Sequence, residues 1–101
     1  MFFAFGPEIG YQVLTTSGVV GDSAKPQALY AAACKSGGTA GTATFFDGTS
    51  SLGTVVYDVQ GTINTTVFNN PSIGQVFPKG LYVSFDSNVS RVTVWSRQIL
   101  T

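Results

Sequence analysis

The chain has 101 residues, which is the length of a single domain with one modest hydrophobic core. Its five basic and five acidic residues cancel, and charged residues make up only 10% of the sequence, so we predict no nucleic acid partner, because phosphate binding requires clustered Lys and Arg. The twelve Thr, ten Ser and 13% aromatic residues favour strands, because β-branched and aromatic side chains suit a pleated surface.

The first ten residues form an apolar segment, and we divide the chain into an arm at residues 1–10 and a β-sandwich domain at residues 11–101. The arm lacks a basic flank and is far shorter than a signal-peptide core or a membrane span, so we predict no targeting segment and no membrane partner. An exposed apolar arm usually docks onto a partner, which makes Phe2, Phe3 and Phe5 candidate interface residues. The alternative is that the arm folds back over its own sheet.

Turn-forming residues divide the rest of the chain into about eight short extended segments, a spacing typical of a sandwich or barrel. The alternation in residues 11–20 predicts the first strand. Residues 27–34 are rich in Ala, and Pro26 would suit the first turn of a helix. Eight residues would make a marginal helix but a normal strand, so we predict a strand here as well.

The clearest predicted hairpin joins residues 41–46 to residues 53–59. Its turn begins at Asp47-Gly48, because the glycine supplies the positive φ that tight turns need. Residues 63–68 and 73–77 are predicted as the next two strands, and a turn follows at residues 78–80.

Residues 80–86 and 90–96 are predicted as the last pair of strands, joined through Ser87-Asn88. Side chains of a strand alternate between its two faces, so every second residue of each strand should face the core. The predicted core residues of this pair are Leu81, Val83, Phe85, Val92 and Val94.

The same alternation places Arg91, Thr93 and Trp95 on the opposite face of the last strand. Trp and Arg are enriched at the energetic centres of protein interfaces, so these three residues are the second candidate interface. The alternative is a register irregularity that turns Trp95 into the core.

The sequence offers no basis for catalysis. It contains no His, which removes the commonest general base and the commonest transition-metal ligand. The carboxylates fall mostly in predicted turns or at strand ends, where they accept local backbone hydrogen bonds; they are Glu8, Asp22, Asp47, Asp58 and Asp86. We therefore predict no enzyme, no catalytic residues, no metal and no cofactor. The lone Cys34 excludes an intramolecular disulfide, and we expect it to be a small buried hydrophobe.

Several segments in chain order resemble small virion proteins of tailed bacteriophages. The matching segments are Ala28-Leu29-Tyr30, residues 37–49, residues 52–56 and residues 77–83. Within residues 11–96 they reproduce an LY strand, a GT-T-DGTS--GT hairpin and a P-GLYV strand. The family in question is that of the capsid decoration, or cement, proteins.

This resemblance implies an all-β, single-domain, antiparallel β-sandwich that is jelly-roll-like. It also implies a homotrimer bound to the major capsid protein on the outer surface of the virion. Two alternatives remain open for the function. One is a structural protein of the tail, the connector or a fibre tip. The other is a carbohydrate-binding module in which Trp95, Tyr82 or Tyr57 forms a stacking platform.

Overall fold

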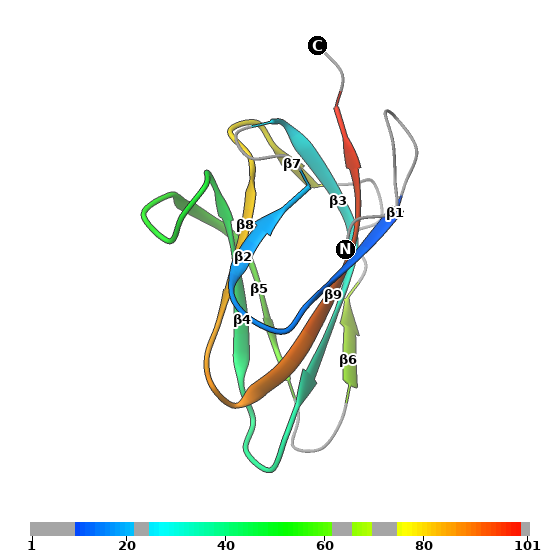
Figure 1. The fold of residues 1–101 in the computed structure, drawn as a ribbon, viewed down its shortest axis with the longest axis vertical. Coiled ribbons are helices and arrows are strands. Elements are labelled where there is room, and N and C mark those ends of the chain that lie inside the picture. Colours follow the sequence, from blue (N-terminus) through cyan, green and yellow to red (C-terminus); the bar gives the residue numbers. More distant parts are fainter. Residues whose placement is uncertain (1–9, 22–24, 62–65, 70–74, 100–101) are drawn as a thin grey trace.

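The computed structural model describes residues 10–21, 25–61, 66–69 and 75–99 (Figure 1). Within these residues the chain forms nine strands and no helix. The strands are β1 (Gly10–Leu14), β2 (Gly18–Val20), β3 (Gln27–Ser36), β4 (Thr42–Asp47), β5 (Thr54–Gln60), β6 (Thr66–Asn69), β7 (Gln75–Phe77), β8 (Leu81–Phe85) and β9 (Val89–Gln98).

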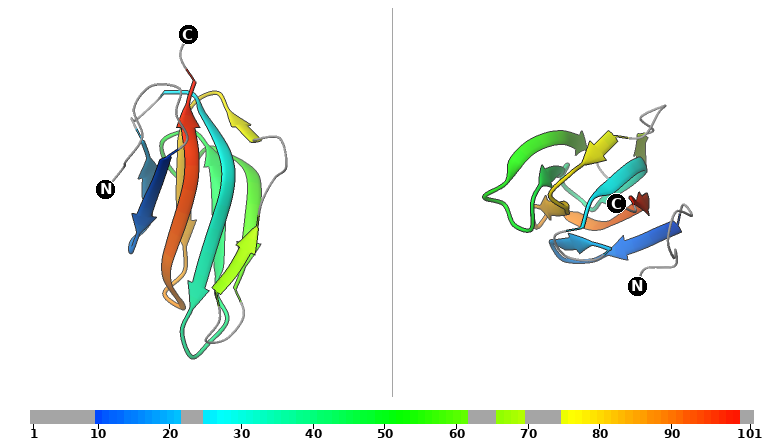
Figure 2. Two further views of the ribbon diagram at one scale, coloured as in Figure 1. Left: turned by 90° about the vertical axis from the view of Figure 1, so that its right-hand side faces the viewer. Right: turned by 90° about the horizontal axis from the view of Figure 1, so that it is seen from above.

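The strands form two antiparallel sheets that pack face to face. The five-stranded sheet has the order β1-β9-β3-β6, and β7 also pairs with β3. The four-stranded sheet has the order β2-β8-β4-β5. Turning the molecule brings β1, β9, β3 and β6 side by side, with the second sheet behind them (Figure 2, left). The prediction of an all-β antiparallel sandwich is confirmed, with nine described strands in place of about eight.

The core lies between the inner faces of the two sheets, and both sheets contribute to it. Its side chains come from alternate positions of the strands, as the period of two predicts. The buried cluster consists of Leu14, Val20, Leu29, Ala32, Cys34, Ala43, Phe45, Val59, Phe77, Leu81, Val83, Val89, Val92 and Val94. The predicted core residues of the last two strands are confirmed, with Phe85 half-buried and packed against the cluster.

The Ala-rich segment forms the central strand β3, as predicted, and not a helix. It pairs with β9 along one edge and with β6 and β7 along the other. Eight of its ten residues are buried, so packing on both faces outweighs the helical preference of Ala. An irregularity between Leu29 and Ala31 leaves Tyr30 without an opposite residue on β9.

The first predicted strand is wrong as a single element. Residues 11–20 alternate as one strand would, but the structure interrupts them at residues 15–17. β1 pairs with β9 in one sheet, whereas β2 pairs with β8 in the other. The chain therefore crosses from one sheet to the other at residues 15–17. The alternation of side chains continues through these residues, so it could not reveal the crossing.

The last two strands exist as predicted, but they are not paired with each other. β8 pairs with β2 and β4 in the four-stranded sheet, and β9 pairs with β1 and β3 in the five-stranded sheet. The turn at residues 86–88 is thus a crossover between layers. Of the two strands predicted before them, β6 and β7 are present, and residues 63–65, 73 and 74 lie outside the described residues.

The predicted hairpin between β4 and β5 is confirmed, and Gly48 has a φ of 149°. The turn at residues 78–80 docks against it, because the backbone N–H of Gly48 donates to the carbonyl of Gly80 at 3.0 Å. The Asp47 carboxylate accepts a hydrogen bond from the backbone N–H of Lys79 at 2.7 Å. Asp47 is thus a turn acceptor, as its position in the sequence predicts.

The side chain of Gln12 closes one open edge of the sandwich. Its Nε2 donates to the carbonyl of Val19 at 3.2 Å, and its Oε1 accepts from the backbone N–H of Gly21 at 2.9 Å. The amide thereby satisfies two backbone groups of the edge strand β2 and its end, which would otherwise be available for pairing with another strand. It also ties the two sheets together at β1 and β2.

Candidate functional site

The outer face of β9 carries the interface residues predicted on this strand. Val92 and Val94 are fully buried between the sheets, while Arg91 is exposed. Thr93 and Trp95 face the same side as Arg91 and are half-buried. The alternation is therefore confirmed through this strand, and Trp95 is not turned into the core. The other predicted interface residues, Phe2, Phe3 and Phe5, lie outside the described residues.

Neighbouring strands extend this face into a surface. Trp95 lies opposite Tyr11 on β1 and Ala31 on β3, and Thr93 lies opposite Val13. Tyr11 and Val13 are 41% and 40% exposed, which makes them two of the most exposed large apolar side chains of the described residues. This face is thus aromatic and aliphatic in its middle.

Positive charge surrounds the apolar centre of this face. Lys35 on β3 lies directly opposite Arg91 on β9. Further along β9, the guanidinium of Arg97 lies 6.0 Å from the centre of the Tyr30 ring, within the range of a cation–π interaction. The described strands of the five-stranded sheet contain these three cations and no carboxylate.

The four-stranded sheet has the opposite charge. Its strands contain Asp47 and Asp58 and neither Lys nor Arg. Asp58 is exposed and lies opposite Thr44, which in turn lies opposite Ser84. The two sheets of this neutral chain therefore differ in charge, and a sum over the whole sequence conceals the difference.

An apolar row crosses the outer face of the four-stranded sheet. Cross-strand pairing joins Val19 to Tyr82, Tyr82 to Phe46 and Phe46 to Val55, so the row spans all four strands. Val55 is 53% exposed, and the rings of Phe46 and Tyr82 lie with centres 6.2 Å apart at 56°. Such a row on a sheet face is a candidate protein-binding surface.

Sequence reasoning missed this row, although one signal for it was present. Phe45 and Phe46 are adjacent in an alternating strand, so one of the two rings must face outwards. Phe45 is fully buried, and its ring packs edge to face on that of Tyr57, with the ring centres 5.7 Å apart. Phe46 therefore lies on the outer side. The partners of Phe46 could not be inferred, because they depend on which strands share its sheet.

The aromatic residues considered for sugar binding do not form one platform. Trp95 lies on the outer face of the five-stranded sheet, and Tyr82 lies on the outer face of the four-stranded sheet. Tyr57 packs against the core from β5. The structure therefore separates the three rings onto different surfaces.

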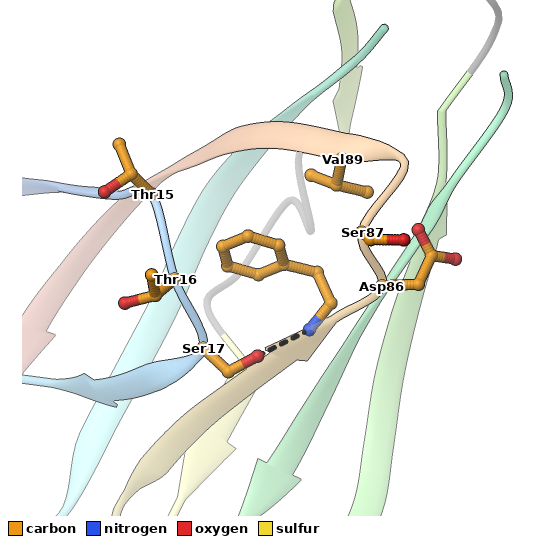
Figure 3. A pocket seen from close by; sticks show the side chains of 7 residues that line it. Thr15, Thr16, Ser17, Asp86, Ser87 and Val89 are labelled. Atoms are coloured by element: carbon orange, nitrogen blue, oxygen red, sulfur yellow. Dashed lines mark hydrogen bonds between the residues drawn. The ribbon is translucent and has the colours of Figure 1, made fainter. Parts of the chain in front are cut away.

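A shallow pocket of about 390 Å³ lies where β1 crosses to β2 and β8 crosses to β9 (Figure 3). Its lining residues are Thr15, Thr16, Ser17, Phe85, Asp86, Ser87 and Val89. The Ser17 hydroxyl accepts a hydrogen bond from the backbone N–H of Phe85 at 3.0 Å, so it helps to hold the two crossovers together.

The only titratable side chain in the lining of this pocket, Asp86, has both oxygens engaged. Oδ1 accepts from the backbone N–H of Asn88 at 3.0 Å, and Oδ2 accepts from that of Thr42 at 3.1 Å. This carboxylate organises the turn and fastens it to the start of β4. The pocket thus presents hydroxyls and one aromatic ring, but no free acid or base.

Cys34 lies in the core, where its Sγ is fully enclosed by the inner faces of the sheets. Burial raises the pKa of this thiol above its ordinary value of 9.0, and the nearby negative charge of Asp86 raises it further. Burial and the neighbouring Asp58 likewise raise the pKa of Tyr57 above 10.0. The burial of Cys34 agrees with the prediction that it is a small buried hydrophobe.

These two pKa shifts predict alkaline destabilisation. The folded chain keeps the Cys34 proton at pH values where the unfolded chain releases it, so the free energy of unfolding falls as the pH rises above about 9. Urea denaturation between about pH 7 and about pH 10.5 should show this fall. In Cys34→Ala the fall should be shallower, although the variant starts from a lower stability. Parallel pH profiles for the two proteins would contradict the assignment to this thiol.

Metal-ligand groups and membrane-spanning helices are absent from the part of the chain that the structure describes. In it, no three His, Cys, Asp or Glu side chains gather as metal ligands, and no helix could span a membrane. No protein-family model matches the sequence, and no curated protein or solved structure is significantly similar to it. The candidate functional site consists of the outer faces of the two sheets, because exposed apolar side chains such as Tyr11, Val13 and Val55 lie there.

Proposed function

We propose that this chain is a structural virion protein that binds the outside of a bacteriophage capsid and stabilises the head as a decoration protein. The observation that carries the proposal is the pair of outer faces of a small sandwich, each with exposed apolar side chains. A subunit of a shell needs complementary surfaces and no reaction centre. Rows such as Val19–Tyr82–Phe46–Val55 supply one of these surfaces.

The strand order supports a finer assignment of the fold as a jelly roll. The two facing sheets have the orders β1-β9-β3-β6 and β2-β8-β4-β5, which are the orders expected when two Greek keys are wound into a sandwich. The motifs that resemble decoration proteins lie in β3, in the β4–β5 hairpin and in β8. The segments that resemble decoration proteins are therefore strands and turns of the sandwich itself.

The proposed partners are the major capsid protein and further copies of this chain, in a homotrimer. The residues proposed for these contacts are Phe2, Phe3 and Phe5 in the arm and Arg91, Thr93 and Trp95 on β9. A standard interface buries about 800 Å² per partner, and many such contacts on one shell reinforce it through multivalency.

The proposal is tested by the abundance and position of the chain in intact particles. Quantitative mass spectrometry of purified virions should give hundreds of copies per particle, measured against the major capsid protein. Electron microscopy should place these copies on the outside of the head, and heads that lack the protein should rupture at a lower temperature. A few copies per particle would instead assign the chain to the tail, the connector or a fibre, and would refute the decoration role.

A further inference from the structure

The central strand β3 of the five-stranded sheet is buried on its outer side as well as towards the core. Three small residues of β3 take outer positions opposite the outer face of β9, and none of them belongs to the core cluster; they are Ala28, Ala31 and Ala33. Their side chains are only 3%, 7% and 9% exposed. A strand that is covered on both faces has a nearly continuous apolar sequence, and β3 has such a sequence.

The four-stranded sheet shows a different pattern on its outer face. Its two central strands, β8 and β4, alternate between buried and half-buried residues, as strands do when water reaches one of their faces. In the five-stranded sheet, the large rings beside the alanines are covered too, since Trp95 and Tyr30 are half-buried in spite of their outer positions. The outer face of the five-stranded sheet is therefore the more deeply covered of the two.

The chemistry of this face indicates what kind of segment fits it. Its middle is aromatic, because Tyr11 lies opposite Trp95 in one row across β1 and β9. The described strands of this sheet carry three cations, Lys35, Arg91 and Arg97, and no carboxylate. A segment that packs here should therefore be apolar, and any charge that it carries should be negative.

The segment that precedes β1 has this composition. Residues 1–9 of the arm contain three Phe residues and a single charged side chain, the carboxylate of Glu8. The arm joins the sheet at Gly10, which lies opposite Ser96 and next to the row of Tyr11 and Trp95.

The arm is also long enough to cross the outer face. The nine residues before Gly10 can span about 30 Å. The sheet runs from β1 through β9 and β3 to β6, with these strands side by side (Figure 2, left). Three strand spacings measure about 14 Å, so the arm can reach from the edge strand β1 across the outer side of β3.

We propose that the arm docks across the outer face of the five-stranded sheet of its own chain, with Phe2, Phe3 and Phe5 packed over Trp95 and the outer side of β3. The arm of the same chain is the occupant because a tethered segment meets its own sheet at an effective concentration in the millimolar range. The arm of a second copy would have to reach that concentration in solution to compete. The docked arm supplies a covering layer for the alanines of β3.

This contact makes the two candidate interfaces of the chain cover each other. The Phe residues of the arm and the surface around Trp95 are buried together in the free protein, and neither contacts a capsid until they separate. The contact goes beyond the decoration role, because it is a property of the isolated chain and does not depend on what the chain binds. It also keeps apolar surface from water before assembly.

The experiment uses Trp95, the only tryptophan of the chain, so its fluorescence reports on this face alone. The triple variant Phe2→Ala, Phe3→Ala and Phe5→Ala, made in the full-length chain, should shift the emission of Trp95 to longer wavelengths. It should also raise the acrylamide quenching constant about twofold, because water reaches a ring that the arm no longer covers. Emission and quenching equal to those of the parent chain would overturn the docking.

Phe46→Ala provides the matched control, because Phe46 lies on the outer face of the other sheet. It should leave the emission of Trp95 unchanged, and circular dichroism should show that both variants keep the fold of the parent. A shift in Phe46→Ala as large as that in the triple variant would mean that the emission does not report on the arm, and would overturn the assignment.

Glu8→Lys serves as a second variant that leaves every apolar side chain of the arm in place. It brings a cation to a face that carries only cations, so it should shift the emission in the same direction by a smaller amount. About 1 M NaCl should reduce this shift, because salt screens the repulsion. If the triple variant does not fold, Glu8→Lys decides, and emission equal to that of the parent overturns the docking.

Protein concentration separates docking on the same chain from docking on a second copy. The emission of the parent should be constant between about 1 µM and about 100 µM, since a contact within one chain does not depend on concentration. A shift to shorter wavelengths as the concentration rises would mean that a neighbouring copy covers Trp95, and would overturn the proposal. Each of these results leaves the copy number in particles as a separate test of the decoration role.

Discussion

Replacement of Phe45 by alanine is expected to lower the free energy of unfolding by about 3–5 kcal/mol, the loss that follows removal of a fully buried aromatic ring. The Phe45 ring is fully buried between the sheets and contacts Tyr57 edge to face, so the substitution removes both a core contact and an aromatic pair. A domain of this size is stabilised by only about 5–15 kcal/mol. Urea denaturation should therefore show a much lower midpoint for Phe45→Ala, with much of the protein unfolded at modest urea concentrations.

The adjacent residue supplies a control with the same change in chemistry. Phe46 lies on the outer face of the same strand, half-buried beside Tyr82. Phe46→Ala should cost about 1 kcal/mol or less, because solvent already reaches much of the ring. Equal losses for the two variants would mean that the rings share a similar environment, and would contradict the register of β4 with β5 and β8.

The faces of individual strands could be predicted from the sequence because side-chain direction depends on local geometry. Alternation alone placed Leu81 and Val83 in the core and Trp95 outside it, and the structure agrees. The strand at β3 was predicted from its length in spite of its Ala content. In each of these cases the information lies within ten residues of the chain, as alternation for β8 and β9 and as segment length for β3.

The pairing of strands could not be predicted in the same way, because pairing is a property of the whole sandwich. A chain that turns back within a sheet and a chain that crosses to the other sheet show the same alternation and the same turn residues. The prediction therefore merged β1 with β2, and it paired β8 with β9. The hairpin at Asp47-Gly48 was correct because its two strands are in fact neighbours.

One part of the candidate site could be predicted from the sequence and the other could not, for the same reason. Arg91, Thr93 and Trp95 share one strand, so their common face followed from alternation. The row through Phe46 and Tyr82 joins four strands, and its existence depends on strand order. The charge difference between the sheets also depends on strand order, because only the topology assigns each Lys, Arg and Asp to a layer. A net charge of zero gave no indication of it.

Replacement of Gly41 by alanine tests how tightly the end of the sandwich is closed. A Cβ at this position would lie 2.6 Å from both Oδ1 of Asp86 and Cγ2 of Val89, and 3.0 Å from the backbone nitrogen of Val89. The backbone N–H of Gly41 also donates to the buried hydroxyl of Ser36 at 3.1 Å, so the loop has little freedom to retreat. The added methyl must displace the turn that Asp86 fastens to β4, and overpacking of this kind costs about 1–3 kcal/mol. Thermal denaturation should show a loss at the upper end of that range.

Gly38 lies in the same loop, but its replacement by alanine is expected to stabilise the protein. A Cβ on Gly38 would meet no atom within 4 Å, and Gly38 is not among the described glycines with positive φ. Gly38→Ala should therefore raise the free energy of unfolding by about 0.4–1 kcal/mol, because alanine restricts the unfolded chain without a clash in the folded one. The two variants carry the same added methyl group at different positions of the loop of residues 37–41. A loss of stability in both would mean that the loop as a whole needs glycine for its backbone conformation. Opposite signs would mean that the contact of Gly41 with the crossover between β8 and β9, which holds the two layers together at this end, is what excludes a side chain.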